Sequence, residues 1–316
     1  MQHSTSLEDI ELDGVWLSIG SFDGVHRGHQ EIVQNLTKGA QKDGAKAVVL
    51  TFHPHPAAVL GKRQGAFYLT TPEDKANLLG KLGVDLVITH TFDLDVAHTS
   101  ARDFVRRLNS RLGLRHLVVG FDFALGWNRE GNIQKLEVLG QEFNYTVHTL
   151  SPFKINDEVV SSSLIRKWLS EGNISGVEQL LGRPFGFRGR VVPGDGRGRL
   201  FGIRTANLEV WKDLTIPAIG VYVCRVHLPG NTFGAVTNIG FRPTFDSNKT
   251  TLSIETHLLN FNGDLYGESL EIEFLSRLRD EKKFLSMDAL ITQIHQDIES
   301  ARLVLSSRLE ETRVEI

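Results

Sequence analysis

The chain has 316 residues, of which 41% are hydrophobic and 23% charged, as is ordinary for a globular protein of about two domains. Its formal net charge of −3 shows no basic excess, and no apolar run approaches the ~20 residues that cross a bilayer, so we expect neither a nucleic-acid nor a membrane partner. Residues 1–14 lack the basic and apolar regions of a signal peptide, and the single cysteine, Cys224, excludes an internal disulfide, which together favour a cytoplasmic protein.

The first half of the chain alternates short β-rich runs with amphipathic helical patterns. Pro72 directly after Thr71 marks one helix start, and Ser100 with Asp103 three residues later resembles a capping box that opens a helix through Leu112. Such alternation predicts a parallel, doubly wound, Rossmann-like α/β sheet. The predicted strands are 15–19, 46–52, 86–89, 116–119 and 145–150, and the other predicted helices are 28–42 and 133–143.

The pattern changes near Gly182. Two short helical patterns, 163–171 and 174–181, end in a turn-rich segment, after which strand-like runs follow one another without helices between them. This predicts an antiparallel β-barrel or sandwich and a terminal helix with apolar residues every three or four positions. We therefore expect two domains, 1–183 and 184–316. The predicted strands are 185–192, 220–226, 233–239, 253–259 and 271–278, and the helix stripe is Leu290, Ile294, Ile298, Ala301 and Leu305.

The most informative segment is a strand-to-helix junction at 20–29, with the sequence GSFDGVHRGH. In an open parallel sheet the crevice beyond the strand ends takes ligands, and a helix N-terminus offers unpaired N–H groups that suit phosphate. His26 and His29 lie one helical turn apart, so both rings can face one anion, while Gly20 and Gly24 allow close backbone approach. The segment matches neither a Walker A loop nor a dinucleotide-binding glycine fingerprint, and its histidine spacing disfavours a zinc-hydrolase helix. A tight turn with two solvated histidines is the alternative interpretation.

A second helix start lies at 161–166, with the sequence SSSLIR. Ser162 is predicted to cap this helix, and Arg166 lies about one turn farther along, where it can reach the same anion. The alternative is a plain helix cap with a surface arginine. Together with the junction at 20–29, two helix N-termini, two histidines and one arginine form a plausible clamp for a triphosphate.

These segments resemble the nucleotidylyltransferase superfamily and, in the extended form GSFDGVHRGH, the FMN adenylyltransferase module of the prokaryotic bifunctional riboflavin kinase/FAD synthetases. The segment FHPHP at 52–56 resembles that family's flavin-side loop, with His53 in place of an aspartate, and VGFDF at 119–123 resembles another of its motifs. The resemblance implies ATP-binding or flavin-binding roles. The implied ATP-binding residues are Gly20, Phe22, Gly24, Ser162 and Ser163, and the implied flavin-binding residues are His53, His55 and Asp122.

The implied reaction is attack by the FMN phosphate on the α-phosphorus of ATP, which expels pyrophosphate. It needs no covalent protein nucleophile, because the enzyme has only to align the reactants and neutralise charge on the leaving group. The resemblance gives that work to His26, His29, Arg166 and a bound Mg²⁺.

A glycine-rich, basic loop from 194 leads into IRTAN at 203–207, which resembles the riboflavin kinase motif in which Phe-Pro precedes Thr-Ala-Asn. The resemblance implies that Thr205 and Asn207, both oxygen donors of the kind Mg²⁺ prefers, bind the metal and ATP, and that Gly198 also binds ATP. Ile203 and Arg204 replace the family's Phe-Pro, which frees the loop and adds a cation near the expected phosphates. The sequence leaves open whether this cation assists binding or occupies the site.

The segments NIGFRPTF at 238–245 and IETHLLNF at 254–261 extend the resemblance to the kinase. They imply that Glu255 is catalytic and accepts the proton of the riboflavin 5′-hydroxyl while ATP supplies its γ-phosphoryl group. A solvated, outward-facing strand glutamate is the alternative. The segment LRDEKKF at 278–284 also matches and implies a flavin-binding role for Arg279.

The resemblance as a whole implies an enzyme that phosphorylates riboflavin to FMN and then adenylylates FMN to FAD, with ATP as co-substrate and Mg²⁺ as cofactor. One alternative is an FMN adenylyltransferase whose altered barrel only binds flavin, and another is a flavin-binding regulator without enzymatic activity. Small molecules are the expected partners, and a homo-oligomer is compatible with the sequence.

Overall fold

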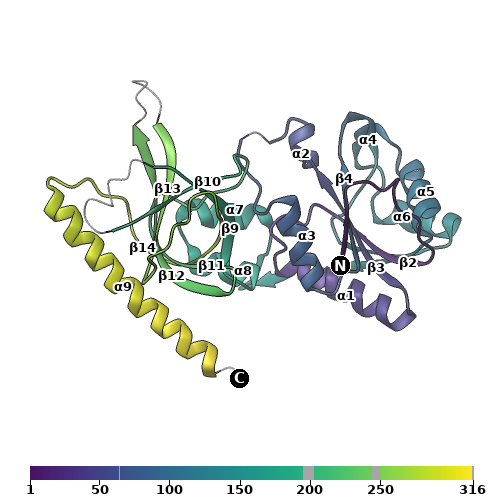
Figure 1. The fold of residues 1–316 in the computed structure, drawn as a ribbon. Coiled ribbons are helices and arrows are strands. Elements are labelled where there is room, and N and C mark those ends of the chain that lie inside the picture. The colour runs from purple at the N-terminus through teal and green to yellow at the C-terminus, as the bar shows by residue number, and fades with distance from the viewer. Residues whose placement is uncertain (64, 195–202, 244–249, 315–316) are drawn as a thin grey trace. The chain divides into compact units, whose positions relative to one another are not determined.

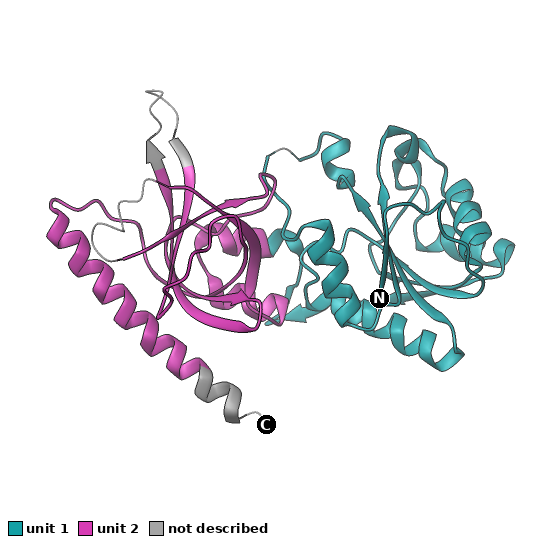
Figure 2. Ribbon diagram, viewed as in Figure 1, with its two compact units in different colours: residues 1–164 teal, residues 165–316 magenta. Residues whose placement is uncertain are grey.

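The computed structural model describes residues 1–316 apart from 64, 195–202, 244–249 and 315–316 (Figure 1). Contacts divide the chain into two compact units, Met1–Leu164 and Ile165–Ile316 (Figure 2). Sequence composition instead places the domain boundary near residue 183, where the turn-rich segment begins. Helix α8 (Ile174–Leu181) lies between the two positions and packs on strands of the second unit. The division into 1–183 and 184–316 stays a prediction about where each activity resides.

A six-stranded sheet in the order β1-β4-β3-β2-β5-β6 forms the first unit, and every pair of neighbouring strands is parallel. The chain runs outward from β2 through β3 and β4 and then returns to the other side of β2 as β5. The strand order therefore reverses between β2 and β5, where open parallel sheets take their ligands. The strands are β1 (Gln2–Ser4), β2 (Val15–Ile19), β3 (Lys46–His53), β4 (Leu86–Thr91), β5 (Leu114–Gly120) and β6 (Thr146–Leu150).

Helices cover both faces of this sheet, as the alternating pattern predicts (Figure 1). Apolar residues of α1 (Arg27–Asp43) and α3 (Pro72–Lys81) form one core with one face of the strands. Residues of α5 (Ala101–Leu112) and α6 (Ile133–Phe143) form a second core with the other face. Both predicted caps are confirmed, since the Thr71 and Ser100 hydroxyls each accept a hydrogen bond from an N–H three residues later.

Shorter elements complete the first unit. They are α2 (Pro56–Val59), α4 (Leu94–His98), a 3₁₀ turn at Trp127–Arg129, and the hairpin of β7 (Lys154–Ile155) and β8 (Glu158–Val159). Helix α7 (Ser162–Glu171) begins in the first unit and continues into the second.

The second unit is a closed antiparallel barrel in the order β10-β13-β12-β11-β14-β9, which decides between the predicted barrel and sandwich. Aromatic rings of Phe185, Phe187, Tyr222 and Phe274 contact one another in its interior. The terminal helix α9 (Met287–Val314) packs Ile298 and Ala301 into a separate apolar cluster with residues of the strands. The strands are β9 (Phe185–Val192), β10 (Ala206–Val210), β11 (Gly220–Leu228), β12 (Asn231–Pro243), β13 (Thr250–Leu258) and β14 (Ser269–Arg279).

Candidate active sites

The turn after β2 has an unusual backbone. Phe22 and Val25 adopt positive φ angles of 48° and 43°, which residues other than glycine rarely adopt. Gly24 between them has a φ of 79°. Such non-glycine residues cost about 1–3 kcal/mol each and persist only where their surroundings enforce the conformation. The fold therefore has to hold this turn in place from outside, and several contacts do so.

Buried polar contacts tie the turn to residues 69 and 70. The Asp23 carboxylate, 2% exposed, accepts hydrogen bonds from the backbone N–H groups of Leu69 at 2.9 Å and Thr70 at 3.3 Å. The Gly24 N–H donates to the Thr70 hydroxyl at 3.3 Å. A Cβ atom on Gly24 would come within 2.8 Å of Leu69. Gly24 is therefore required both for its φ angle and for this close approach.

Lys75 on α3 supports the same turn. Lys75 is only 5% exposed. Its ammonium group donates to the Ser21 carbonyl at 3.0 Å and to the Thr51 hydroxyl at 2.9 Å. The Thr51 hydroxyl in turn donates to the Ser21 carbonyl at 3.0 Å. Burial lowers the pKa of Lys75 to about 8, against the opposing effects of Asp23 and Glu73.

His26 and His29 lie together at the N-terminus of α1. His26 is the N-cap, and its Nδ1 accepts a hydrogen bond from the His29 N–H at 3.3 Å. The two rings stack with centroids 3.6 Å apart and planes inclined by 17°. The spacing therefore does place both imidazoles together at a helix N-terminus, as the sequence predicts.

The electrostatic surroundings of His29 favour a neutral ring. Burial lowers its pKa well below the usual value, and the neighbouring His26 and Lys75 lower it further. The buried Nδ1 of His29 has no hydrogen-bond partner among the described residues. An acceptor or donor of a ligand would satisfy this atom, so the geometry suits an occupied site better than a tight turn with two solvated histidines.

The start of α7 is attached to the same turn. The Ser162 hydroxyl donates to the Asp23 carbonyl at 2.9 Å, and the Ser163 hydroxyl accepts from Arg63 at 2.9 Å. The prediction that Ser162 caps α7 is wrong, because Ser161 precedes the first helical residue and its hydroxyl accepts from the Leu164 N–H at 3.2 Å. Arg166 lies in the second unit, on the first turn beyond these serines.

The residues predicted to bind flavin follow strands on either side of β2. His53 ends β3, and the Nδ1 of His55 caps α2 by accepting from the Ala57 N–H at 3.0 Å. The ring of Tyr68 lies 5.7 Å from His53 and 6.4 Å from His55, measured between centroids. Asp122 follows β5 and is exposed. The carboxyl ends of parallel strands share one sheet edge, so His53, Asp122 and the turn after β2 lie along the same edge.

In the barrel, strand register brings together residues that are far apart in the sequence. Glu255 on β13 pairs with Asn207 on β10 and with Asn238 on β12. The alternate residues Ile254 and Thr256 are buried, and residues directly opposite one another in antiparallel strands share a face, so all three polar side chains lie on the outer face. The predicted base and the predicted metal ligand are thus direct neighbours.

Further contacts shape this polar face. The Ser253 hydroxyl donates to Glu255 Oε1 at 3.2 Å. A Cβ on Gly194 would lie 2.0 Å from Asn207 Nδ2, so a side chain at this position would displace the Asn207 amide. Thr205 directly precedes β10, and the Arg204 carbonyl contacts His257 Nδ1 at 2.7 Å. Gly198, predicted to bind ATP, lies outside the described residues.

Arg279 is held by an ion pair. Its guanidinium contacts both carboxylate oxygens of Asp297 on α9, with Nε at 3.0 Å from Oδ1 and Nη2 at 2.7 Å from Oδ2. Both side chains are largely buried. The structure thus assigns Arg279 an architectural contact that the sequence does not reveal, and its flavin-binding role stays a prediction.

In the barrel, the chemistry of the predicted donors suits Mg²⁺ bound mainly through phosphate. Among the described residues there is no group of three or more His, Cys, Asp or Glu side chains that could hold a metal ion by themselves. The hydroxyl of Thr205 and the amide oxygen of Asn207 are the hard donors that Mg²⁺ takes in ones and twos beside substrate phosphates.

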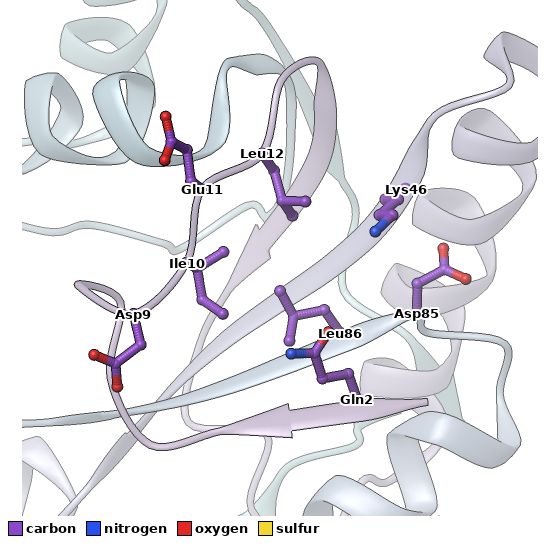
Figure 3. A pocket seen from close by; sticks show the side chains of 8 residues that line it. All are labelled: Gln2, Asp9, Ile10, Glu11, Leu12, Lys46, Asp85 and Leu86. Carbon is purple, nitrogen blue, oxygen red and sulfur yellow. The ribbon is translucent and has the colours of Figure 1, made fainter.

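A cavity of about 170 Å³ lies at the opposite edge of the parallel sheet, where β1, β3 and β4 begin (Figure 3). Charged side chains such as Lys46 and Asp85 line it, but none of the predicted site residues does. The cavity is therefore separate from the candidate adenylyl-transfer site. In the part of the chain that the structure describes, no helix is both long and apolar enough to cross a membrane.

Sequence reasoning overlooked some of these residues. Lys75 carries a recognisable signal, because it occupies the apolar face of α3 one turn before Leu79, where a solvated lysine is out of place. Asp23 and Asn238 belong to motifs that are recognisable in the sequence, but their partners are distant along the chain and become visible only in the fold.

Both units match known protein families. Residues 9–164 match the family model for FAD synthetase, and residues 181–305 match that for riboflavin kinase. A protein of Listeria monocytogenes named bifunctional riboflavin kinase/FMN adenylyltransferase is 36% identical over 287 residues, covering 90% of this chain and 91% of its own. A protein of the same name from Pseudomonas fluorescens is 37% identical and covers 92% of each chain.

A solved structure is also similar. A crystal structure from Streptococcus pneumoniae, described as a macrolide-efflux protein, has a TM-score of 0.85 and 30% sequence identity and covers 95% of this chain and 98% of its own. The two family matches follow the order of modules that the sequence predicts.

Proposed function

Because the chain belongs to the bifunctional riboflavin kinase/FMN adenylyltransferase family, we propose that its first unit adenylylates FMN and that its barrel phosphorylates riboflavin. The enzyme uses ATP twice. It first transfers a γ-phosphoryl group to riboflavin and then an adenylyl group to the FMN so formed, which gives FAD and pyrophosphate.

In the adenylyl transfer, a phosphate oxygen of FMN attacks the α-phosphorus of ATP while the bond to pyrophosphate breaks. The N-terminus of α1 presents N–H groups to the phosphates, with His26 and His29 stacked at its first turn. Ser162, Ser163 and Arg166 contribute from the start of α7. Gly20, Phe22 and Gly24 bind ATP by shaping the turn. The Phe22 ring lies 3.1 Å from where a Cβ on Gly20 would stand, so a side chain at position 20 would crowd this ring.

The flavin end of FMN would lie along the same sheet edge, toward His53 and His55 on one side and Asp122 on the other. Support comes from the positions of these residues after β3 and β5, the two neighbours of β2. The buried rings of Phe67 and Tyr68 pack edge-on against His55 and hold its ring at this edge.

In the kinase reaction, Glu255 accepts the proton of the riboflavin 5′-hydroxyl as that oxygen attacks the γ-phosphorus of ATP. Thr205 and Asn207 would hold Mg²⁺, which when bound neutralises charge on the phosphates. The direct pairing of Asn207 with Glu255 supports this arrangement, because it puts the metal ligand next to the base. Gly198 would bind ATP and Arg279 the flavin, the latter with its guanidinium fixed by Asp297.

The stacking of His26 on His29 at the α1 N-terminus, beside the point where strand order reverses, is the observation that carries the adenylyl-transfer assignment. Incubating the purified protein with riboflavin, ATP and Mg²⁺ and separating the flavins by chromatography tests both reactions. We expect FMN and then FAD. FAD formation from supplied FMN without any riboflavin phosphorylation would show that the barrel has only a binding role, and flavin binding without turnover would show a regulator.

A cytoplasmic location and a homo-oligomeric state stay predictions. Fractionation of the source cells and sedimentation of the purified protein would test them.

A further inference from the structure

Three polar groups form a closed triangle beneath the turn at 20–25. The Lys75 ammonium donates to the Ser21 carbonyl and to the Thr51 hydroxyl, and that hydroxyl donates to the same carbonyl. The lysine reaches from α3, the threonine from β3, and the carbonyl belongs to the turn itself. One ammonium group thus joins three separate segments of the fold at the backbone that leads to His26.

Burying this lysine is unfavourable for folding. A buried ammonium group loses its hydration, and apolar replacements of buried charges are often neutral or stabilising. The groups that interact with its charge are the carboxylates of Asp23 and Glu73, and the ring of His29 on α1. Folding alone does not require a cation here, since Thr51 would still satisfy the Ser21 carbonyl if the lysine were replaced.

We propose that Lys75 is a positioning residue for adenylyl transfer, which holds the 20–25 turn and the histidines that follow it in their reactive arrangement. The inference rests on the proposed function of the first unit. The turn contains two residues other than glycine with positive φ, so it needs an external restraint, and Lys75 provides one at the Ser21 peptide. A displacement of about 1 Å at reacting groups can reduce a rate ~10²-fold.

Lys75 also acts on the histidines through its charge. Its positive charge is one of the causes that lower the pKa of His29, together with burial and the neighbouring His26. Replacing Lys75 by a neutral residue should therefore raise the pKa of His29. Any limb of the pH–rate profile of FAD formation that His29 controls should move to higher pH.

The kinetic test compares Lys75→Met with wild type in FAD formation from supplied FMN and ATP. Methionine has a similar length and no charge, and we expect kcat to fall by ~10–10²-fold. Riboflavin phosphorylation by the same chain should be unchanged, which shows that the effect is confined to the first unit. Lys81→Met is the matched control, because Lys81 is exposed on the same helix, and it should leave both activities unchanged.

Two further measurements separate positioning from general loss of structure. Thr51→Val keeps the shape and the lysine but removes the shared hydroxyl, and it should lower kcat for FAD formation by less than Lys75→Met does. Titration of the His29 ring by NMR should show a higher pKa in Lys75→Met. Thr51→Val retains the cation and should not show that rise.

The outcomes are distinguishable. A wild-type protein that makes no FAD from FMN overturns the proposed function, and the role of Lys75 with it. A wild-type protein that makes FAD, together with a Lys75→Met variant of equal kcat and unchanged pH profile, refutes only the role of Lys75. If Lys75→Met also loses kinase activity, Thr51→Val decides, and wild-type kcat in that variant refutes the proposal.

Discussion

The two units assemble their sites in different ways. In the first unit, a single continuous segment at 20–29 supplies the strained turn, the helix N-terminus and both histidines. In the barrel, Asn207, Asn238 and Glu255 lie on three strands and meet only through register. The first site therefore depends on backbone conformation held by buried polar contacts, whereas the second depends on the correct pairing of strands.

The two sites should therefore be sensitive to different kinds of substitution. The turn at 20–25 is supported by buried groups such as Asp23 and Lys75, so a change outside the site can displace it. The barrel face is carried by a closed ladder of hydrogen bonds, so its side chains can be exchanged without moving the backbone. Variants in the two units should accordingly separate the two reactions.

The largest expected effect is that of Glu255→Gln on riboflavin phosphorylation. Glutamine keeps the size and hydrogen-bonding reach of the side chain but removes the proton acceptor, and a general base typically contributes ~10²–10⁴ to a rate. FMN formation should fall by that factor, while binding of riboflavin and ATP and FAD formation from supplied FMN continue. A smaller loss would make Glu255 a positioning residue, because phosphoryl transfer through a loose transition state needs little base. Full activity would refute any role.

His29→Ala should produce the reciprocal result. Loss of one preorganised group that stabilises developing charge typically costs ~10²–10³ in rate. FAD formation should fall by that factor, and FMN formation should be unchanged, because the ring lies in the first unit. Assays with FMN and with riboflavin as separate substrates measure the two reactions. Equal loss of both would contradict separate sites, and unchanged FAD synthesis would remove His29 from the mechanism.

The same contrast explains how much of each site the sequence could predict. The junction at 20–29 is local, so its glycines, its histidines and the following helix can be interpreted from spacing alone, and α1 begins one residue before the predicted start. Both β2 and α8 have the predicted bounds. Glu255 and Asn207 are 48 positions apart in numbering, and only the family resemblance links them before the register is known.

Three kinds of feature are not predicted from the sequence, each for a physical reason. β1 has only three residues, all polar, and β10 alternates apolar and polar residues over only five positions, so neither strand is prominent in the sequence. Their pairing is provided by strands distant in the chain. The sequence predicts the cap of α7 at Ser162, one residue beyond the observed cap at Ser161, because three serines in succession offer equivalent hydroxyls. Buried polar contacts such as those of Lys75 depend on the packing of three segments, which periodicity does not encode.

Two fragments of the barrel unit test whether the second site is independent. The fragment 165–316 retains α8, whose Val177, Leu180 and Leu181 are buried, whereas 184–316 lacks it. A fully buried aliphatic side chain contributes about 1.5–3 kcal/mol, so 184–316 should unfold at a lower temperature. Both thermal unfolding and riboflavin phosphorylation should be measured. Equal stability and activity of the two fragments would support the boundary at 183, and an inactive 165–316 fragment would show that the units depend on each other.

The smallest expected effect concerns the buried charge of Lys75. Its pKa is lowered to about 8 in the folded protein, chiefly by burial, and the group returns to its usual value of 10.5 on unfolding. Between these two pH values the unfolded chain binds more protons than the folded one, so the contribution of Lys75 to stability rises with pH. Below pH 8 the lysine is charged in both states and destabilises the fold by at most about 3 kcal/mol.

Denaturant unfolding of wild type and Lys75→Met at pH 7.5 and pH 10 isolates this effect, because other groups that titrate in the range act on both proteins alike. The free energy of unfolding of wild type, relative to the variant, should be higher at pH 10 than at pH 7.5. Lys81→Met should show no such change, since Lys81 is exposed. A difference between wild type and Lys75→Met that does not depend on pH would mean that the ammonium group is solvated in the native state. The restraint on the 20–25 turn would then come from the remaining contacts, those of Asp23, Gly24 and Thr51.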